Sequence, residues 1–274
     1  MAAPAISSRR LGGWALRGAA GFTMLYILLP LIFVTWLSFF WQEIPSFPPE
    51  GYSLRWYKAI ASNDRFVDGF LLSLQLGVIA TALGLTVGVP AALCLNRYAF
   101  IGKEGLNSLL LLPLMVPGVV LGMALYVSQV EAEIATGLPF LGSLGGLVMG
   151  HILIVIPWTV RLVTASLAGF ERTLEEAAQS LGADRWTTFR RITLPSILPG
   201  VVAAALFGFV SSFGNLEMSL FLVGPGRTTL PIAILQYLEW KIDPTIAAVS
   251  VVQILLIGGA MLLTDRFVKI SRVV

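Results

Sequence analysis

The sequence has little charge and few of the side chains from which catalytic or metal sites are built. Of its 274 residues, 12% are charged, and it holds one cysteine, Cys94, and one histidine, His151. A lone cysteine excludes an internal disulfide framework, and a lone histidine cannot by itself form a metal site. The G-x-x-x-x-G-K-[ST] phosphate loop is also missing. The sequence therefore predicts no enzyme, no metal site and no ATP binding by that loop.

Long apolar runs take the place of charge. Hydrophobic residues make up 57% of the chain, and the mean hydropathy is +0.85. About 20 consecutive apolar residues suffice to cross a bilayer as a helix. Six runs reach that length, at 19–41, 69–95, 106–130, 142–170, 196–223 and 245–264. We therefore expect an all-α membrane protein of six transmembrane helices, with a lead at 1–18, a transmembrane domain at 19–264 and a tail at 265–274.

Proline and glycine mark irregular places within these runs. Pro90 predicts a kink in the second span, and Pro113 and Pro117 interrupt the third. The polar segments at 42–68 and 224–244 are predicted to be loops. Phe39, Phe40 and Trp41 are predicted to be aromatic residues at the membrane interface, at the end of the first span.

Basic residues set the predicted orientation. Thirteen of the 18 Lys and Arg residues fall in one alternating set of segments, which includes the N-terminal lead, the loop at 171–195 and the C-terminal tail. The positive-inside rule places this set in the cytoplasm. Both termini are then predicted to be cytoplasmic, which an even number of spans allows. Because the small positive net charge follows membrane topology, no nucleic-acid partner is expected.

The loop at 171–195, called the central loop below, has the pattern of two short helices joined by a glycine turn. Four apolar residues recur at i, i+3, i+4 and i+7, which places them on one face of a helix: Leu174, Ala177, Ala178 and Leu181. Gly182 is the expected C-terminal stop. Asp184 is a candidate N-cap for a second helix through Arg191, and Pro195 suits the first turn of the next span. A small apolar face beside charges predicts a docking surface for another protein.

The central loop resembles the EAA loop of ABC-importer permeases. The match consists of Glu176-Ala177-Ala178, three residues, Gly182, nine residues, Ile192, one residue and Leu194-Pro195. The resemblance implies coupling helices that dock on a cytoplasmic ATPase subunit. The residues expected to couple are Leu174, Glu175, Glu176, Ala177, Ala178, Leu181, Gly182 and Ala183. An amphipathic helix at the membrane interface is the alternative.

Candidate solute-path residues lie near the end of the fifth run, because polar groups at membrane depth are costly and hence informative. Ser212, Asn215 and Ser219 share one face if the helix is continuous, and they either line a path or make contacts between helices. Glu217 either faces a path and attracts a cationic or polar solute, or pairs with another chain or lies near the outer headgroups. His151 either lines a path or makes a helix contact.

The stretch from His151 onward is similar to the polyamine-type branch of these permeases. The residues that carry this are His151, Pro157, the segment 211–217, Gly224-Pro225, Thr229-Leu230-Pro231 and Ile234. Members of that branch often have two consecutive aspartates after the Ser-Phe pair, where this chain has Gly214 and Asn215. The predicted solute therefore stays open among polyamines, opines and amino-acid-like compounds.

The predicted function is that of a permease subunit of an ATP-driven importer in a bacterial inner membrane. The resemblance implies a heterodimer with a second permease, two ATPase subunits that hold ATP and Mg²⁺, and an extracytoplasmic binding protein. No cofactor is expected on this chain itself. The alternative is a secondary transporter driven by an ion gradient, which would use paired ionisable residues within the spans and an internal repeat.

Overall fold

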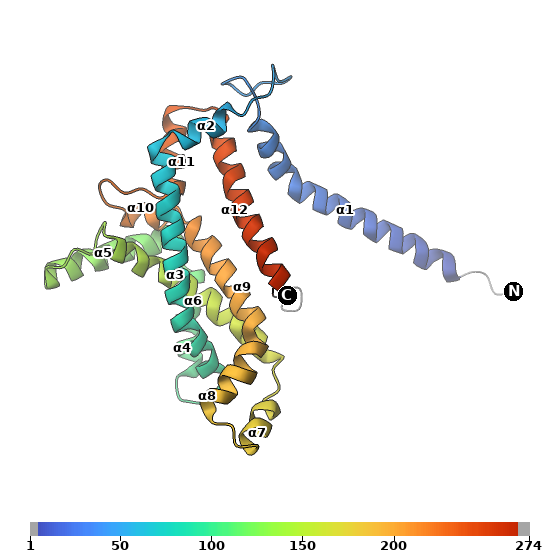
Figure 1. Cartoon of the computed structure of the whole chain (residues 1–274), viewed down its shortest axis with the longest axis vertical. Coiled ribbons are helices and arrows are strands. Elements are labelled where there is room, and N and C mark those ends of the chain that lie inside the picture. Colours follow the sequence, from blue (N-terminus) through green and yellow to red (C-terminus); the bar gives the residue numbers. More distant parts are fainter. Residues whose placement is uncertain (1–4, 268–274) are drawn as a thin grey trace. The chain divides into compact units, whose positions relative to one another are not determined.

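The structure is a computed structural model that describes residues 5–267, with side chains described from 16 to 266. Helices account for nearly all of its regular structure (Figure 1). Among the described residues, six helices are long and apolar enough to cross a membrane. The predicted class, an all-α protein with six membrane-spanning helices, is confirmed. Residues 1–4 of the predicted lead and 268–274 of the predicted tail lie outside the described part.

The chain forms two compact units, one that includes the chain up to Ser62 with Trp240–Leu255, and another that includes Asn63–Glu239 and the chain from Leu256 onward. The first unit contains α1 (Ala5–Leu37), α2 (Arg55–Ala61) and the beginning of α12 (Thr245–Phe267). Helix α1 begins within the predicted lead and ends at Leu37, so Phe39, Phe40 and Trp41 follow the first span instead of completing it.

Those aromatics belong to an ordered segment in the first unit. Trp56 of α2 is buried and its indole N–H donates to the carbonyl of Phe40 at 2.6 Å. The guanidinium of Arg55 lies 4.2 Å from the centre of the Trp56 ring and 4.8 Å from that of Trp41. Arg55-Trp56-Tyr57 therefore opens a short helix that packs on the segment after α1.

The second unit is a helical bundle whose centre is formed by three helices, α3 (Asp64–Arg97), α6 (Leu144–Ala168) and α9 (Leu194–Phe213). The remaining helices of this unit are α4 (Lys103–Leu111), α5 (Gly118–Thr136), α7 (Thr173–Ser180), α8 (Arg185–Thr188), α10 (Ser219–Leu222) and α11 (Leu230–Trp240). Helix α11 lies in what the sequence predicted to be a polar loop, and its Leu230 and Ile232 are buried.

Glycines let the three central helices approach closely. Val155 of α6 packs between Gly84 of α3 and Gly208 of α9. A Cβ at Gly84 would lie 2.4 Å from Val155 Cγ1, and one at Gly208 would lie 2.8 Å from the same atom. No real side chain fits at those distances. Small residues at such contacts are the usual means by which membrane helices pack, so the bundle holds these helices as one block.

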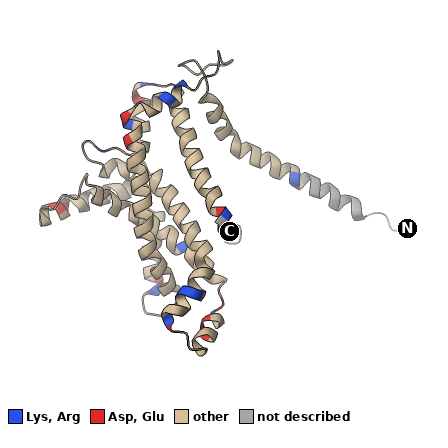
Figure 2. Cartoon of the chain, viewed as in Figure 1, with Lys and Arg blue, Asp and Glu red and all other residues tan. Residues whose placement is uncertain are grey.

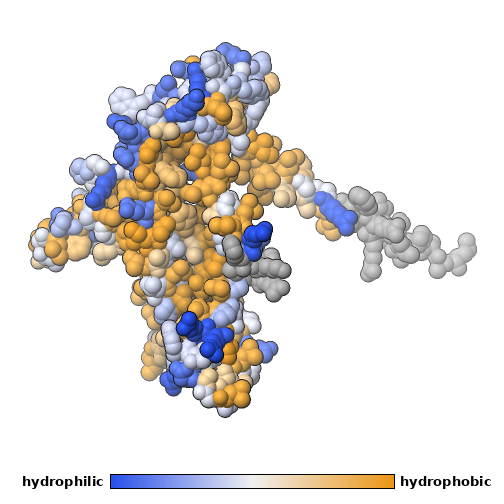
Figure 3. Space-filling model, viewed as in Figure 1, coloured by the Kyte–Doolittle hydropathy of each residue, from blue (hydrophilic) through white to orange (hydrophobic). Residues whose placement is uncertain are grey.

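Two predicted spans have other bounds than the sequence pattern indicates. The third is interrupted at Pro113 and Pro117 as predicted, since α4 ends at Leu111 and α5 starts at Gly118, but the helix of membrane-spanning length is Gly118–Thr136 and not 106–130. The fifth ends at Phe213, ten residues before its predicted end at Val223. Charged residues gather near helix ends and in loops (Figure 2), and apolar residues cover the middle of the long helices on the visible face (Figure 3).

Candidate functional site

The central loop folds as a helix, a glycine turn and a second helix, as the pattern predicts. The turn after α7 is a Schellman motif: the N–H of Gly182 donates to the carbonyl of Gln179, and that of Ala183 to the carbonyl of Ala178, both at 3.0 Å. This motif requires a left-handed residue at its centre. Gly182 supplies it with φ +90°, and no atom lies within 4 Å of where its Cβ would be. The glycine is therefore needed for its backbone angle alone.

Asp184 caps the second helix, α8. Its carboxylate accepts a hydrogen bond from the backbone N–H of Thr187 at 3.2 Å. The hydrogen bonds from the side chain and the backbone of Thr187 hold the pKa of Asp184 below its ordinary value. The second helix does not stop at Arg191 as predicted: α8 continues through a π-helical segment, Phe189–Thr193, directly into α9, and Pro195 lies in the first turn of α9 as predicted. A displacement of the central loop can therefore pass along the chain into a membrane-spanning helix.

The two faces of α7 have different surroundings. Leu174 is 50% exposed and Leu181, at the C-cap, is 89% exposed. Glu176 and Ala177 are exposed beside them. Together with the half-buried Ala178, these residues form what we call the α7 surface. The α7 surface is apolar apart from Glu176, and none of the residues that the structure describes covers it.

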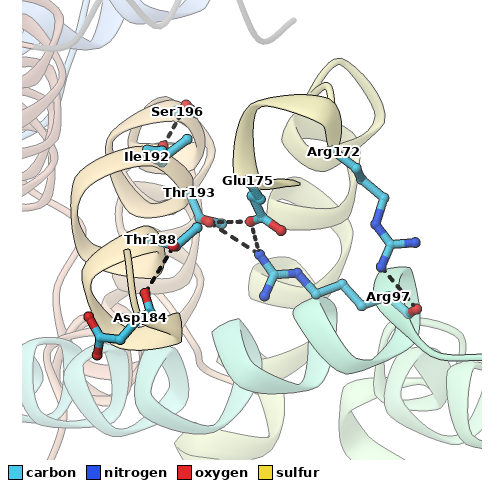
Figure 4. A network of polar contacts seen from close by, with 8 residues as sticks. All are labelled: Arg97, Arg172, Glu175, Asp184, Thr188, Ile192, Thr193 and Ser196. Carbon is cyan, nitrogen blue, oxygen red and sulfur yellow. Dashed lines mark hydrogen bonds and ion pairs between the residues drawn. The ribbon is translucent and has the colours of Figure 1, made fainter. Parts of the chain in front are cut away.

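Glu175 lies on the opposite face and is turned inward (Figure 4). Its carboxylate forms an ion pair with Arg97, the last residue of α3, and accepts a hydrogen bond from the hydroxyl of Thr193 in the π-helical segment. Arg97 also donates to the Thr193 hydroxyl at 3.2 Å. Arg172 donates to the backbone carbonyl of Arg97 at 3.4 Å. Sequence reasoning placed Glu175 in the loop but could not find Arg97, which is 78 residues away.

The predicted path residues surround the break between α9 and α10. Ser212 and Ser219 are fully buried, and their hydroxyls contact Nδ1 and Nε2 of His151 at 2.7 and 3.2 Å. The side-chain oxygen of Asn215 accepts the N–H groups of Met218 and Ser219 at 3.1 and 3.3 Å. These residues do converge, but through an interrupted helix and not along one continuous face.

Glu217 is the path candidate whose side chain is exposed. It packs against Gly118, the first residue of α5, where a Cβ would lie 2.2 Å from Glu217 Oε2. The positive end of a helix dipole favours a carboxylate there. Glu217 lies between α9 and α10, outside the six helices that are long enough to span a membrane.

Comparison with known proteins identifies the family. Residues 81–272 match the family described as binding-protein-dependent transport system inner membrane component. The spermidine/putrescine transport system permease protein PotC of Haemophilus influenzae is 28% identical over 89% of this chain and 92% of its own length. The putrescine transport system permease protein PotI of Escherichia coli K12 is 29% identical over 84% of this chain and 81% of its own.

A third relative has a different named solute. The putative 2-aminoethylphosphonate transport system permease protein PhnV of Salmonella paratyphi A is 29% identical over 93% of this chain and 95% of its own length.

Solved structures share the fold. A bacterial ABC transporter chain involved in alginate import superposes with a TM-score of 0.72 at 14% identity, over 97% of this chain and 99% of that one. A chain of the MetNI methionine ABC transporter gives a TM-score of 0.61 at 20% identity, over 74% of this chain and 94% of that one. With the family match covering most of the sequence and the fold agreeing, the predicted relationship is confirmed: the chain belongs to the inner-membrane components of binding-protein-dependent transport systems.

Proposed function

We propose that this chain is one membrane-spanning subunit of an ATP-driven importer, and that its α7 surface docks on a cytoplasmic ATPase subunit. The observation that carries the proposal is the exposure of Leu174 and Leu181 on a helix whose other face is fixed to the protein. Exposed leucines beside charges, on a loop between two spans, favour burial by a partner protein. The side of the membrane that holds this loop is then the cytoplasm, with both termini.

The chain contains no phosphate loop, so ATP and Mg²⁺ are held by separate ATPase subunits, one for each of two permeases. The relatives PotC and PotI belong by name to spermidine and putrescine transport systems. The second permease is a related chain, and the solute arrives on an extracytoplasmic binding protein. ATP-driven closure of the ATPases pushes the central loop, and α9, which continues from α8, moves with it.

The solute we propose carries an amino group. Spermidine, putrescine and 2-aminoethylphosphonate, the solutes named for three relatives, share that group. Glu217 is the carboxylate that attracts the ammonium, and Asn215, Ser212 and Ser219 keep the break between α9 and α10 in shape beside it. An opine or amino acid satisfies the same requirement, so the ammonium is the shared chemistry and the remainder of the solute is set by the binding protein.

Copurification tests the docking role. Leu181→Asp places a charge on the most exposed apolar side chain of the α7 surface. Leu138→Asp is the matched control, because Leu138 is 59% exposed in the loop after α5. We expect the ATPase subunits to be lost from the complex with Leu181→Asp and retained with Leu138→Asp. Equal retention in both variants would refute the docking role of the α7 surface.

A further inference from the structure

The central loop is attached to the bundle at a point where three elements meet on one carboxylate. Glu175 of α7 contacts Arg97 at the end of α3 and Thr193 in the π-helical segment that leads into α9. The Arg97–Thr193 hydrogen bond closes a triangle among these three side chains. We call Arg97, Glu175 and Thr193 the Glu175 triad.

Two members of the triad, Arg97 and Glu175, carry opposite charges, and each compensates the charge of the other. The side chains of Arg97 and Glu175 are 24% and 12% exposed, and Thr193 is fully buried. At that burial, removing the charge of one partner leaves the other insufficiently compensated. The backbone carbonyl of Arg97 also accepts a hydrogen bond from Arg172, the N-cap residue of α7, so two residues of the central loop contact the end of α3.

The two elements joined to α7 lead to the helices at the centre of the bundle. Helix α3 and helix α9 both pack on Val155 of α6 through glycines, so each moves with the packed core. The π-helical segment between α8 and α9 is an irregular turn of the kind often found at functional hinges. A force on the exposed face of α7 therefore has two routes inward, one through the covalent chain to α9 and one through Glu175 to α3.

We propose that the Glu175 triad is a positioning device that transmits movement of the α7 surface to α3 and α9 together. This inference rests on the proposed function. Docking uses the outward residues of α7, whereas the triad includes Glu175 on its inward face. A substitution can therefore remove transmission by the triad and leave docking intact, or the reverse. Without the Glu175 charge, α7 still carries its apolar surface, but it is no longer fixed to α3 and to the π-helical segment, so its displacement reaches the bundle through the chain at α8 alone.

The test uses the complete importer reconstituted in lipid. Glu175→Gln removes the charge and keeps the size of the side chain. Glu171→Gln makes the same change at an exposed carboxylate four residues earlier in the same loop. The measurements are ATPase copurification, basal ATP hydrolysis, the stimulation of hydrolysis by loaded binding protein, and solute uptake.

For Glu175→Gln we expect unchanged copurification and basal hydrolysis, with stimulation and uptake reduced about tenfold, a usual size for coupling between sites. Glu171→Gln should behave as the unmodified protein. Exchanging the partners, Arg97→Glu with Glu175→Arg, should restore part of the stimulation that either single change removes.

Three results would overturn the proposal. Unchanged stimulation and uptake in Glu175→Gln would show that the charge transmits nothing. Loss of copurification in Glu175→Gln would make the triad a support for docking alone. Equal loss in Glu171→Gln would make the effect one of loop charge. If the unmodified protein fails to copurify with an ATPase, the proposed function itself is wrong, which is a distinct outcome.

Discussion

Substitution of Gly182 tests whether docking depends on the backbone conformation of the central loop, because it leaves the side chains of the α7 surface unchanged. The Schellman turn holds Gly182 at φ +90°, and the space around its missing Cβ is empty. An alanine there would meet no neighbour, so its whole cost is the left-handed backbone, about 1–2 kcal/mol. That is a factor of about 5–30 in the equilibrium constant between the formed and the open turn.

If the turn must be formed for α7 and α8 to dock together, the affinity for the ATPase subunit falls by at most the same factor. We therefore expect Gly182→Ala to weaken binding, by up to about 30-fold. Gly182→Asn should weaken it less, because asparagine tolerates this conformation. Gly182→Val should weaken it most, because a β-branched residue is an outlier there.

The assay is titration of the purified ATPase subunit onto the permease in lipid nanodiscs. Gly226→Ala is the matched control: Gly226 has φ +75° and equally empty surroundings, but lies in the turn after Val223, outside the central loop. The reasoning would be refuted by a Gly182→Val variant that binds with full affinity, or by a Gly226→Ala variant that loses as much as Gly182→Ala.

Three further predictions concern single side chains. Glu217→Gln should reduce uptake of an amine-bearing solute while assembly stays normal, because the ammonium loses its carboxylate; unchanged uptake would leave Glu217 a structural residue beside Gly118. His151→Ala should lower the thermal stability of the purified complex by about 3 kcal/mol, since it opens a buried space and takes the His151 contact from Ser212 and Ser219; an unchanged melting temperature would contradict this. Asp184 has a lowered pKa, so its stabilisation of α8 is complete above the ordinary value of 3.8 and is lost as the pH falls through the lowered value; hydrogen exchange of α8 should show this loss, and Asp184→Asn should remove the pH dependence.

The sequence predicted the class of fold well because the bilayer imposes it. A run such as 245–264 must be helical at membrane depth, and α12 spans Thr245–Phe267. The central loop was equally readable, since Gly182 and Asp184 act through hydrogen bonds within a few residues of themselves. Their roles as the left-handed turn residue and the N-cap are confirmed.

Interactions between distant residues were not readable. Arg97 and Glu175 meet only because the end of α3 lies beside the first turn of α7, and nothing local to either residue indicates its partner. The end of α9 at Phe213 was also missed. The apolar pattern of this run continues to Val223. The side-chain oxygen of Asn215, however, accepts hydrogen bonds from the N–H groups of Met218 and Ser219, and this local alternative to helical hydrogen bonds favours a break.

Helix α11 was missed for a related reason. It follows a segment rich in Gly and Thr, and it is stabilised by tertiary contacts, including a hydrogen bond from the N–H of Leu230 to the hydroxyl of Ser73 on α3 at 2.9 Å. Local pattern gives no sign of such a contact.

Uptake by the reconstituted complex is the measurement that tests the central claim most directly. The permease pair, ATPase subunits and binding protein are placed in liposomes with labelled amine-bearing solute, and uptake is followed with ATP alone and with an ion gradient alone. The account predicts uptake that requires ATP and loaded binding protein and is indifferent to the gradient. Uptake driven by the gradient without ATP hydrolysis would contradict it and identify a secondary transporter.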